Sequence, residues 1–368
     1  MKVDVREISH SEAEAELVAI GLYQGDSLPA EVAEAAGAAA ASGEFKKLSP
    51  AFDGERRLLI VGLGKREEAD AERLRVAAAL VAKQALQLKA GSLAWVLPES
   101  DDETVAAEAI VTGTILAAYR FDRFQKPPEE APARLQSLTL LASEALTEAA
   151  ATARVYAEAA NRARDLQSTP ANSMKPADLA ARAEEIAAGF EALSVEVLGP
   201  AELTAKKMGG LLAVSQGGPV EPRMIVLRYS GGGSGPTLGL VGKGVTFDTG
   251  GISLKPGAGM HEMKYDMSGA AAVLESVAAI AELGLAVDLV AVVPATENMP
   301  SGTAIKPGDV ITQYNGTTVE VNNTDAEGRL ILADALAYAI EQGAERIIDL
   351  ATLTGAVLFA LGHTYAGL

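Results

Sequence analysis

The sequence predicts an α/β protein with two domains, each a mixed β-sheet flanked by helices. Three observations lead to this prediction. The chain has 368 residues, which is long for one average domain, and 49% of them are hydrophobic, which is enough for two substantial cores. Along the chain, short runs typical of strands alternate with alanine-rich runs typical of helices.

The first part of the chain is expected to form an N-terminal α/β domain, residues 1–145. Its predicted strands and helices alternate, as they do in α/β folds. The strands are expected at residues 16–22, 57–62, 93–97 and 137–141, and the helices near residues 30–41, 67–88 and 103–118. The charged, proline-containing segment 121–134 is expected to be an exposed loop.

A helical run without proline or glycine, residues 143–165, is expected to connect this domain to the next. It stops before two prolines, at positions 170 and 176, which forbid its continuation. We assign residues 146–172 to this linking helix and loop, and residues 173–368 to a second domain. That domain is expected to contain a helix at 176–188, strands at 195–198, 223–229 and 237–241, and an Asn-Gly hairpin at 313–321.

The composition excludes several classes of function. The chain has 31 Lys and Arg against 49 Asp and Glu, a net charge of −18, which disfavours binding to nucleic acid or to anionic membranes. It has no cysteine, which excludes disulfides, thiolate metal sites and a cysteine nucleophile. The N-terminus lacks the apolar core of a secretory signal, and no apolar run reaches membrane-spanning length. We therefore expect a cytoplasmic protein without a membrane segment.

Histidine-based and nucleotide-binding sites are also disfavoured. The three histidines are far apart in sequence, and the HExxH motif of zinc peptidases is absent; His261 is given no role. The segment IVGLGKREE has Glu67 where a dinucleotide fingerprint needs its third glycine. The segment LVGKGVTFD has Gly244 where a phosphate-binding loop needs Ser or Thr.

Two charged segments remain as candidates for a site. The first, residues 241–273, contains Lys243, Asp248, Lys255 and Asp266 among glycines and small residues. A helix is expected to begin at Asp266, with a buried face formed by Ala270, Val273, Leu274 and Val277. Charged groups in such surroundings need partners if they are buried. The alternative is that they are ordinary solvated loop charges.

The second segment, residues 321–340, places Asp325, Glu327 and Arg329 at alternate positions. In an extended chain these three side chains would project from one side. A helix is expected to follow and to end at Gly343, with an apolar face formed by Leu332, Leu336, Ala339 and Ile340.

Helix N-termini favour carboxylates, so Asp266 and Asp325 could instead be helix caps. Capping accounts neither for Glu327 nor for the two lysines. Four carboxylates without a nearby histidine or thiolate suit hard or borderline divalent ions held mainly by oxygen.

These segments resemble the M17 leucyl aminopeptidase family. NTDAEGRL, residues 323–330, is similar to the family's signature octapeptide, and VGKGVTFDTGGISLKP and MKYDMSGAAAV are similar to its two metal-site segments. TPAN at 169–172 and DLATLTGA at 349–356 match in the expected order. The first half fits the family's more variable N-terminal domain in general pattern only.

The resemblance implies a catalytic domain with two divalent metal ions per subunit, zinc or manganese. One ion would be bound by Asp248, Asp325 and Glu327, and the other by Lys243, Asp248, Asp266 and Glu327. Lys243 would have to be neutral, with a strongly lowered pKa, which an adjacent dication can supply. The implied reaction is hydrolysis of the first peptide bond of peptide substrates.

The resemblance further implies two catalytic residues and a side-chain pocket. Lys255 would polarise the peptide carbonyl, and Arg329 would hold a bicarbonate ion that accepts the proton of the attacking water. Met263 would line a pocket for leucine-like side chains with Ala326 and Thr352, although a methionine is more often a core residue. The family also implies a homohexamer. Its members continue beyond the HTYAGL end, so the catalytic domain is expected to be incomplete at its C-terminus.

Two other functions are kept as alternatives. The chain could be a catalytically impaired fragment or an assembly protein that binds DNA, as some bacterial relatives do; tight, salt-sensitive binding in a gel shift would favour this. It could also use two metals on a phosphate ester, which a phosphatase turnover above the peptidase turnover would favour.

Overall fold

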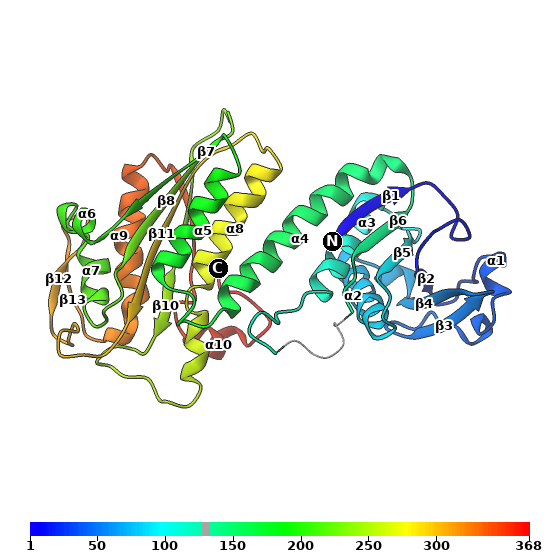
Figure 1. Cartoon of the computed structure of the whole chain (residues 1–368), viewed down its shortest axis with the longest axis horizontal. Coiled ribbons are helices and arrows are strands. Elements are labelled where there is room, and N and C mark those ends of the chain that lie inside the picture. The colour runs from blue at the N-terminus through cyan, green and yellow to red at the C-terminus, as the bar shows by residue number, and fades with distance from the viewer. Residues whose placement is uncertain (127–132) are drawn as a thin grey trace. The chain divides into compact units, whose positions relative to one another are not determined.

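The structure is a computed structural model that describes residues 1–126 and 133–368. The chain divides into two compact units, Met1–Asn161 and Arg162–Leu368, and Figure 1 labels most of their elements. Both units contain a β-sheet flanked by helices, so the predicted fold class is confirmed. The predicted boundaries at residues 145/146 and 172/173 stay a prediction. The predicted loop 121–134 lies partly outside the described residues, and its described ends contain neither helix nor strand.

The first unit contains a six-stranded sheet in the order β1-β6-β5-β2-β4-β3. All neighbouring strands pair in parallel except β3 and β4, which are antiparallel. Buried aliphatic side chains and Trp95 pack between this sheet and helices α2 and α3. The bounds are β1 Lys2–Arg6, β2 Leu17–Tyr23, β3 Leu48–Asp53, β4 Arg56–Gly64, β5 Ser92–Val96, β6 Ser137–Leu141, α2 Ala71–Gln87 and α3 Glu103–Ala117.

Two helix predictions in this unit were partly wrong. The expected helix 30–41 is only a single turn, α1 (Ala30–Ala33), followed by a 3-10 turn at Ala38–Ala40. Gly37, with a φ of 94°, separates them because this backbone conformation cannot continue a helix. Helix α2 begins at Ala71 rather than at residue 67, since the Asp70 side chain accepts a hydrogen bond from Arg73 N at 2.7 Å and caps it.

The second unit contains a sheet in the order β14-β9-β11-β8-β7, with β10 also pairing with β11. Helix α4 (Thr147–Ser168) spans the boundary between the units. The strands are β7 Leu193–Leu198, β8 Arg223–Ser230, β9 Leu238–Gly242, β10 Gly244–Asp248, β11 Asp288–Asn298 and β14 Arg346–Leu350. The helices are α5 Pro176–Ala188, α6 Pro200–Ala205, α7 Gly209–Ser215, α8 Ser268–Glu282, α9 Glu327–Glu341 and α10 Ala356–Leu361.

Successive residues of the central strands face opposite sides of this sheet, and each side is covered by two helices. Val290 and Val292 of β11 pack with side chains of α7 and α9, whereas Ala291 and Val293 pack with side chains of α5 and α8. The predicted buried face of α8 is confirmed: Ala270, Val273, Leu274 and Val277 are all buried. The predicted apolar face of α9 holds for Leu332 and Ala339, but Ile340 is 63% exposed.

The predicted hairpin is present as β12 (Val310–Thr312) and β13 (Thr318–Glu320). Its connection is longer than the two-residue Asn-Gly turn. Gln313 N donates to Thr317 O, and Gly316 N donates to Gln313 O, both at 2.8 Å. Gly316 has a φ of 86°, so the turn ends in a left-handed glycine, as three-residue hairpin loops commonly do.

Candidate metal centre

The centre lies where β10 and β11 end and α9 begins. β10 and β11 run in parallel and are paired at their last residues, Asp248 and Asn298. Asp248 is buried, and its Oδ1 accepts hydrogen bonds from Gly250 N and from Asn298 Nδ2, both at 2.8 Å. Its Oδ2 is 2.8 Å from Lys255 Nζ. One oxygen of Asp248 is therefore held by the fold, and the other faces the centre.

The turn after β10 brings Lys255 back to Asp248. Gly250 and Gly251 have φ values of 87° and 66°, a region that glycine adopts without strain. The turn is closed by Lys255 N, which donates to Thr249 O at 2.9 Å. The Lys255 ammonium also forms an ion pair with Asp325. Burial acts to lower the pKa of Lys255, but the two carboxylates outweigh it, so this pKa lies above its usual value.

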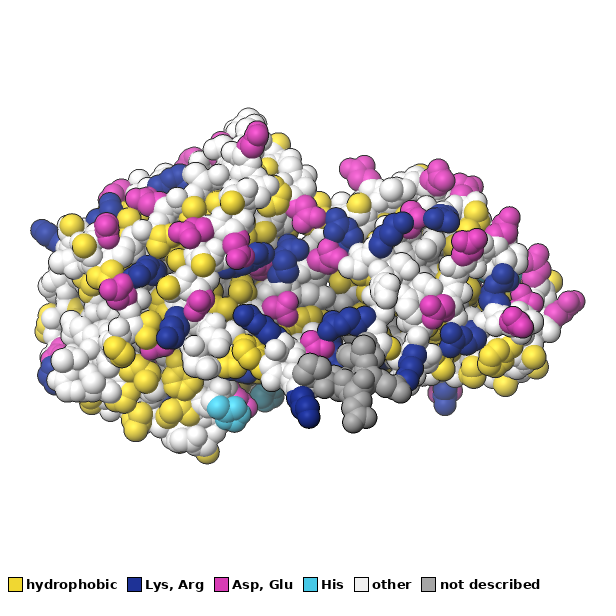
Figure 2. Space-filling model, viewed as in Figure 1, with side chains coloured by type: hydrophobic (Ala, Val, Ile, Leu, Met, Phe, Trp, Pro, Cys, Tyr) yellow, Lys and Arg dark blue, Asp and Glu magenta, His cyan; other side chains and the backbone are white. Residues whose placement is uncertain are grey.

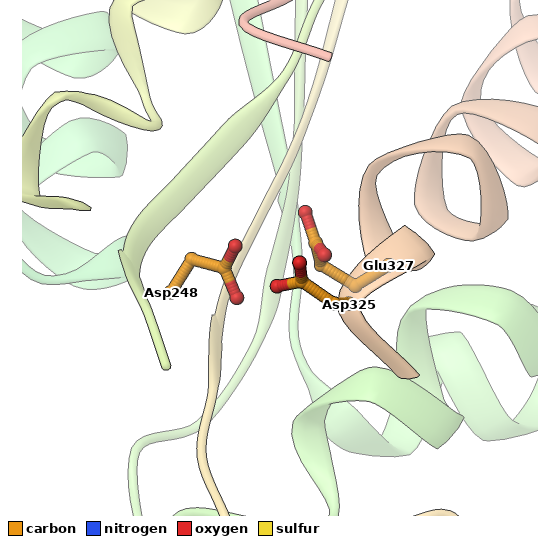
Figure 3. Close-up of side chains that lie close together, drawn as sticks. All are labelled: Asp248, Asp325 and Glu327. Carbon is orange, nitrogen blue, oxygen red and sulfur yellow. The ribbon is translucent and has the colours of Figure 1, made fainter. Parts of the chain in front are cut away.

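Asp325 and Glu327 reach the centre in a different way from the one predicted. The segment is not extended: Thr324–Ala326 is a 3-10 turn that leads directly into α9 at Glu327. The alternation argument was therefore wrong for this segment. Arg329 is exposed on α9, and no hydrogen bond or ion pair joins its side chain to another described residue. In Figure 3, Asp325 and Glu327 point from the start of α9 toward Asp248, and an oxygen of each lies within 4.8 Å of the others.

Lys243 joins the second set of carboxylates. Its Nζ lies 2.8 Å from Asp266 Oδ1 and 2.7 Å from Glu327 Oε1, and it donates to Thr352 O at 3.0 Å. Gly328 packs against this side chain so closely that a Cβ there would lie 2.8 Å from Lys243 Nζ. Burial acts to lower the pKa of Lys243, but Asp266 and Glu327 outweigh it and raise it. Only a bound cation could supply the lowering that metal ligation requires.

The carboxylates have unused capacity for a cation. Burial raises the pKa of Asp266 to about 7, although Lys243 opposes the rise, and burial also raises the pKa of Glu327. Among the described residues, Asp266 Oδ2 and Glu327 Oε2 are buried side-chain oxygens without a hydrogen-bond partner. Buried polar atoms normally have partners. Two such oxygens beside Asp248 and Asp325 form a donor set that fits divalent ions.

The capping alternative is not supported by the hydrogen bonds. Met267, not Asp266, is the cap position of α8, and its side chain makes no capping bond. At the other segment Asn323 Oδ1 accepts from Asp325 N at 2.9 Å, so Asn323 caps the turn and the Asp325 carboxylate remains turned to Lys255.

The three predicted pocket residues are close in sequence to the candidate metal ligands, but they differ in burial. Met263, in the 3-10 segment Met260–Tyr265, and Ala326 are half-buried. Thr352 is exposed overall, but its Oγ1 donates to Asp266 Oδ1 at 2.8 Å. A direct contact with the metal-site carboxylates was not predicted for Thr352.

Sequence reasoning missed Asn298, Thr324 and Ser253. Thr324 Oγ1 donates to Gly250 O at 2.6 Å and accepts from Ser253 N at 2.8 Å, while Thr324 N donates to Ser253 Oγ at 3.1 Å. These bonds fasten the Lys255 turn to the Asp325 turn. The position of Asn298 at the end of a long apolar run was the one available signal.

Two further features concern nucleic-acid and membrane binding, which the composition disfavours: the distribution of surface charge and the length of the apolar helices. On the face shown in Figure 2, Lys and Arg side chains are interspersed with Asp and Glu side chains over both parts of the chain. None of the helices in residues 1–126 and 133–368 is long and apolar enough to cross a membrane.

Comparisons with known proteins agree with this geometry. The description "Cytosol aminopeptidase family, catalytic domain" matches residues 161–368, and "Cytosol aminopeptidase family, N-terminal domain" matches residues 23–128. A probable cytosol aminopeptidase of Roseiflexus castenholzii is 45% identical over 366 residues, which cover 96% of this chain and 75% of the relative. One of Geobacter sp. is 48% identical over 312 residues, covering 83% of this chain and 63% of the relative.

Two solved structures have the same fold. The bottromycin maturation enzyme BotP in complex with Mn matches with a TM-score of 0.83 and 36% identity, over 95% of this chain and 74% of that one. A mutant of tomato leucine aminopeptidase matches with a TM-score of 0.85 and 31% identity, over 98% of this chain and 75% of that one. The chain thus spans between 63% and 75% of the length of these four proteins.

Proposed function

The chain belongs to the cytosol aminopeptidase family, and on this basis we propose that it releases N-terminal amino acids, preferentially leucine-like ones, from peptides. The supporting observation is the cluster of Asp248, Asp325 and Glu327, in which Asp248 and Glu327 are buried and Asp325 is half-buried, flanked by two lysines. When bound, the proposed ions would offer a ligand position to the free α-amino group of a peptide, a group that internal segments lack.

Two divalent ions, zinc or manganese, are proposed to bind here. Asp248, Asp325 and Glu327 would hold one ion, and Lys243, Asp248, Asp266 and Glu327 the other. The unpartnered oxygens of Asp266 and Glu327 support this assignment. When bound, such ions supply Lewis-acid activation of water and of the peptide carbonyl. Lys243 would release its proton to serve as a ligand, because only a neutral amine has a free electron pair.

Lys255 and Arg329 are the proposed catalytic residues. The Lys255 ammonium is held at the centre by its turn and by Asp248, and from there it would donate a hydrogen bond to the carbonyl oxygen and stabilise the developing negative charge. The exposed Arg329 guanidinium can hold bicarbonate through two parallel hydrogen bonds. Arg329 would thereby supply the site with a base for the proton of the attacking water.

The leucine preference is assigned to a pocket lined by Met263, Ala326 and Thr352. The half-buried Met263 offers an adaptable apolar surface for a branched aliphatic side chain. Comparing kcat/KM for leucine, alanine and lysine amides tests this assignment. Equal values for the three amides would contradict it.

The central test uses two variants with matched controls. Glu327→Gln removes a metal ligand and Lys255→Met removes the ammonium, so each should lower leucine amide hydrolysis by more than about a thousandfold, roughly 4 kcal/mol in the barrier. Glu341→Gln, on the same helix, and Lys306→Met, in an exposed ion pair with Asp309, should leave activity unchanged. Circular dichroism checks folding. Full activity in folded Glu327→Gln or Lys255→Met would reject the proposal.

The family resemblance also supports a cytoplasmic homohexamer as part of the proposal. Light scattering after size-exclusion chromatography measures the assembly directly. A monomer at micromolar concentration would contradict the hexamer without touching the catalytic assignment.

A further inference from the structure

Asn298 lies at the end of β11, next to the proposed metal ligands. It is 1% exposed, although an amide is costly to bury without partners. Its Nδ2 donates to Asp248 Oδ1 at 2.8 Å and to Thr324 O at 3.0 Å. One amide group therefore connects the end of β10, which carries Asp248, with the turn that carries Asp325.

The hydrogen bond to Asp248 limits how that carboxylate can act. Oδ1 already accepts from Gly250 N and from Asn298 Nδ2, which fills both of its lone pairs. Only Oδ2 remains directed at the centre, where Lys255 contacts it. Without the Asn298 amide, Oδ1 would lose one partner and the carboxylate could rotate about its Cβ–Cγ bond.

Asn298 itself is held rigidly. Its backbone carbonyl oxygen accepts from Thr249 N at 3.0 Å and from Thr249 Oγ1 at 2.8 Å. Gly251 lets the neighbouring turn approach, since a Cβ there would lie 2.8 Å from Asn298 Oδ1. A fixed amide next to a ligand carboxylate is the arrangement that orients metal ligands and tunes their affinity.

We propose that Asn298 is a positioning residue that orients Asp248 for metal binding and fixes its distance from the Asp325 turn. The inference rests on the proposed function, because it needs Asp248 to be a ligand. Asn298 does not touch substrate in this role. Its removal should weaken metal binding even where the chain stays folded.

The test is Mn²⁺ binding to the full chain, followed through the electron paramagnetic resonance signal of free Mn²⁺ well below the melting temperatures. Asn298→Ala should bind Mn²⁺ about 10–100-fold more weakly than the unmodified chain. Thr246→Val is the matched control: Thr246 is buried on β10 and donates to Thr296 O of β11 at 3.3 Å, so it loses a bond between the same strands without touching Asp248. Its Mn²⁺ affinity should stay within about twofold.

The outcomes separate the two proposals. No stoichiometric Mn²⁺ binding by the unmodified chain would overturn the proposed function and this inference with it. Normal binding by the unmodified chain and equal affinity in Asn298→Ala would overturn only the positioning role. An equal loss in Thr246→Val would also overturn it, since the loss would then follow from strand pairing in general.

A measurement on the unmodified chain covers the case in which Asn298→Ala does not fold. In a chain labelled with ¹⁵N-asparagine, the Asn298 side-chain amide should exchange with deuterium far more slowly than that of the exposed Asn322. Similar exchange rates for the two amides would overturn the hydrogen bond on which the proposal depends.

Discussion

Helix α9 carries two buried carboxylates in opposite surroundings, Glu327 at its first residue and Asp334 two turns later. Asp334 is 0% exposed, and its two oxygens accept from Leu211 N at 2.9 Å and from Tyr314 N at 2.8 Å. Glu327 is 2% exposed, and only its Oε1 has a partner. Burial raises the pKa of both. Burial alone therefore does not distinguish the two carboxylates; an oxygen without a hydrogen-bond partner does.

Other buried carboxylates also divide into those with a partner for both oxygens and those with a partner for only one. Glu275 on α8 resembles Asp334, because both of its oxygens are paired, with Arg162 and Arg182 at 2.7 Å. Asp266 resembles Glu327, because its Oδ2 has no partner. In the described part of the first unit, the buried polar side chains are two threonines, Thr112 and Thr114, and no charged one is buried. The first unit thus offers no comparable centre among its described residues.

The largest expected difference between the two carboxylates is in stabilisation by metal. At a thousandfold excess over Kd, a bound ion raises the free energy of unfolding by about 4 kcal/mol. Glu327→Gln should lose most of this gain, whereas the equally sized change Asp334→Asn should keep it. The measurement is the shift of the thermal midpoint on adding Mn²⁺. Equal shifts in the two variants would contradict the view that Glu327 binds metal and Asp334 does not.

Without metal we expect the opposite order: Asp334→Asn should lower the free energy of unfolding more than Glu327→Gln. Asn at position 334 has one acceptor oxygen, so one buried N–H loses its partner, which costs about 2 kcal/mol and roughly 4–8 °C in midpoint. Glu327→Gln should cost less, because the amide oxygen can still accept from Lys243 and the other atom had no partner. Thermal unfolding with excess chelator compares them, and a larger loss in Glu327→Gln would contradict this expectation.

Metal binding should also release protons in a pH-dependent number. Ligation needs ionised Asp266 and neutral Lys243, and the pKa of both is raised in the metal-free chain, that of Asp266 to about 7. Below this pH Asp266 carries a proton, which the ion displaces on binding. Above this pH Asp266 is already ionised and releases none. Binding should therefore release more protons near pH 5.5 than near pH 8.5, and the proton of Lys243 should be released at both. Titration calorimetry in buffers of different ionisation enthalpy counts them; a constant number would contradict the raised pKa of Asp266.

The smallest expected effect concerns Thr352. Thr352→Val removes the hydrogen bond to Asp266 Oδ1, which should weaken Mn²⁺ binding about tenfold. Thr354→Val, two residues on, loses only a local bond to Ala356 N and serves as the control. If Thr352→Val changes the preference among amino acid amides and leaves Mn²⁺ affinity unaltered, Thr352 belongs to the pocket and not to the metal centre.

Local patterns predicted the elements near the centre well. Proline at the first position and helical spacing located α5 at its observed bounds, and spacing alone identified the buried face of α8. The hydrophobic run of β11 was not predicted, because a strand buried on both faces has no alternation to detect.

The convergence of the charged residues could not follow from spacing. Lys243, Asp266 and Glu327 come from three segments that meet only through the order of strands in the sheet and the packing of α8 and α9. The resemblance to known aminopeptidases supplied that grouping. The local argument for Asp325 and Glu327 used an extended chain, and it failed because Asn323 starts a helical turn there.

Gly328 sets a limit on how this helix can evolve. In most helices, replacing a glycine with alanine stabilises the helix by about 1 kcal/mol, so selection for stability favours the replacement. At position 328 the added methyl group would meet Lys243 Cε and Nζ at 2.8 Å. A substitution that stabilises the helix would therefore displace the Lys243 side chain, so the two requirements conflict at position 328. Stabilising libraries built on this chain should leave position 328 unchanged.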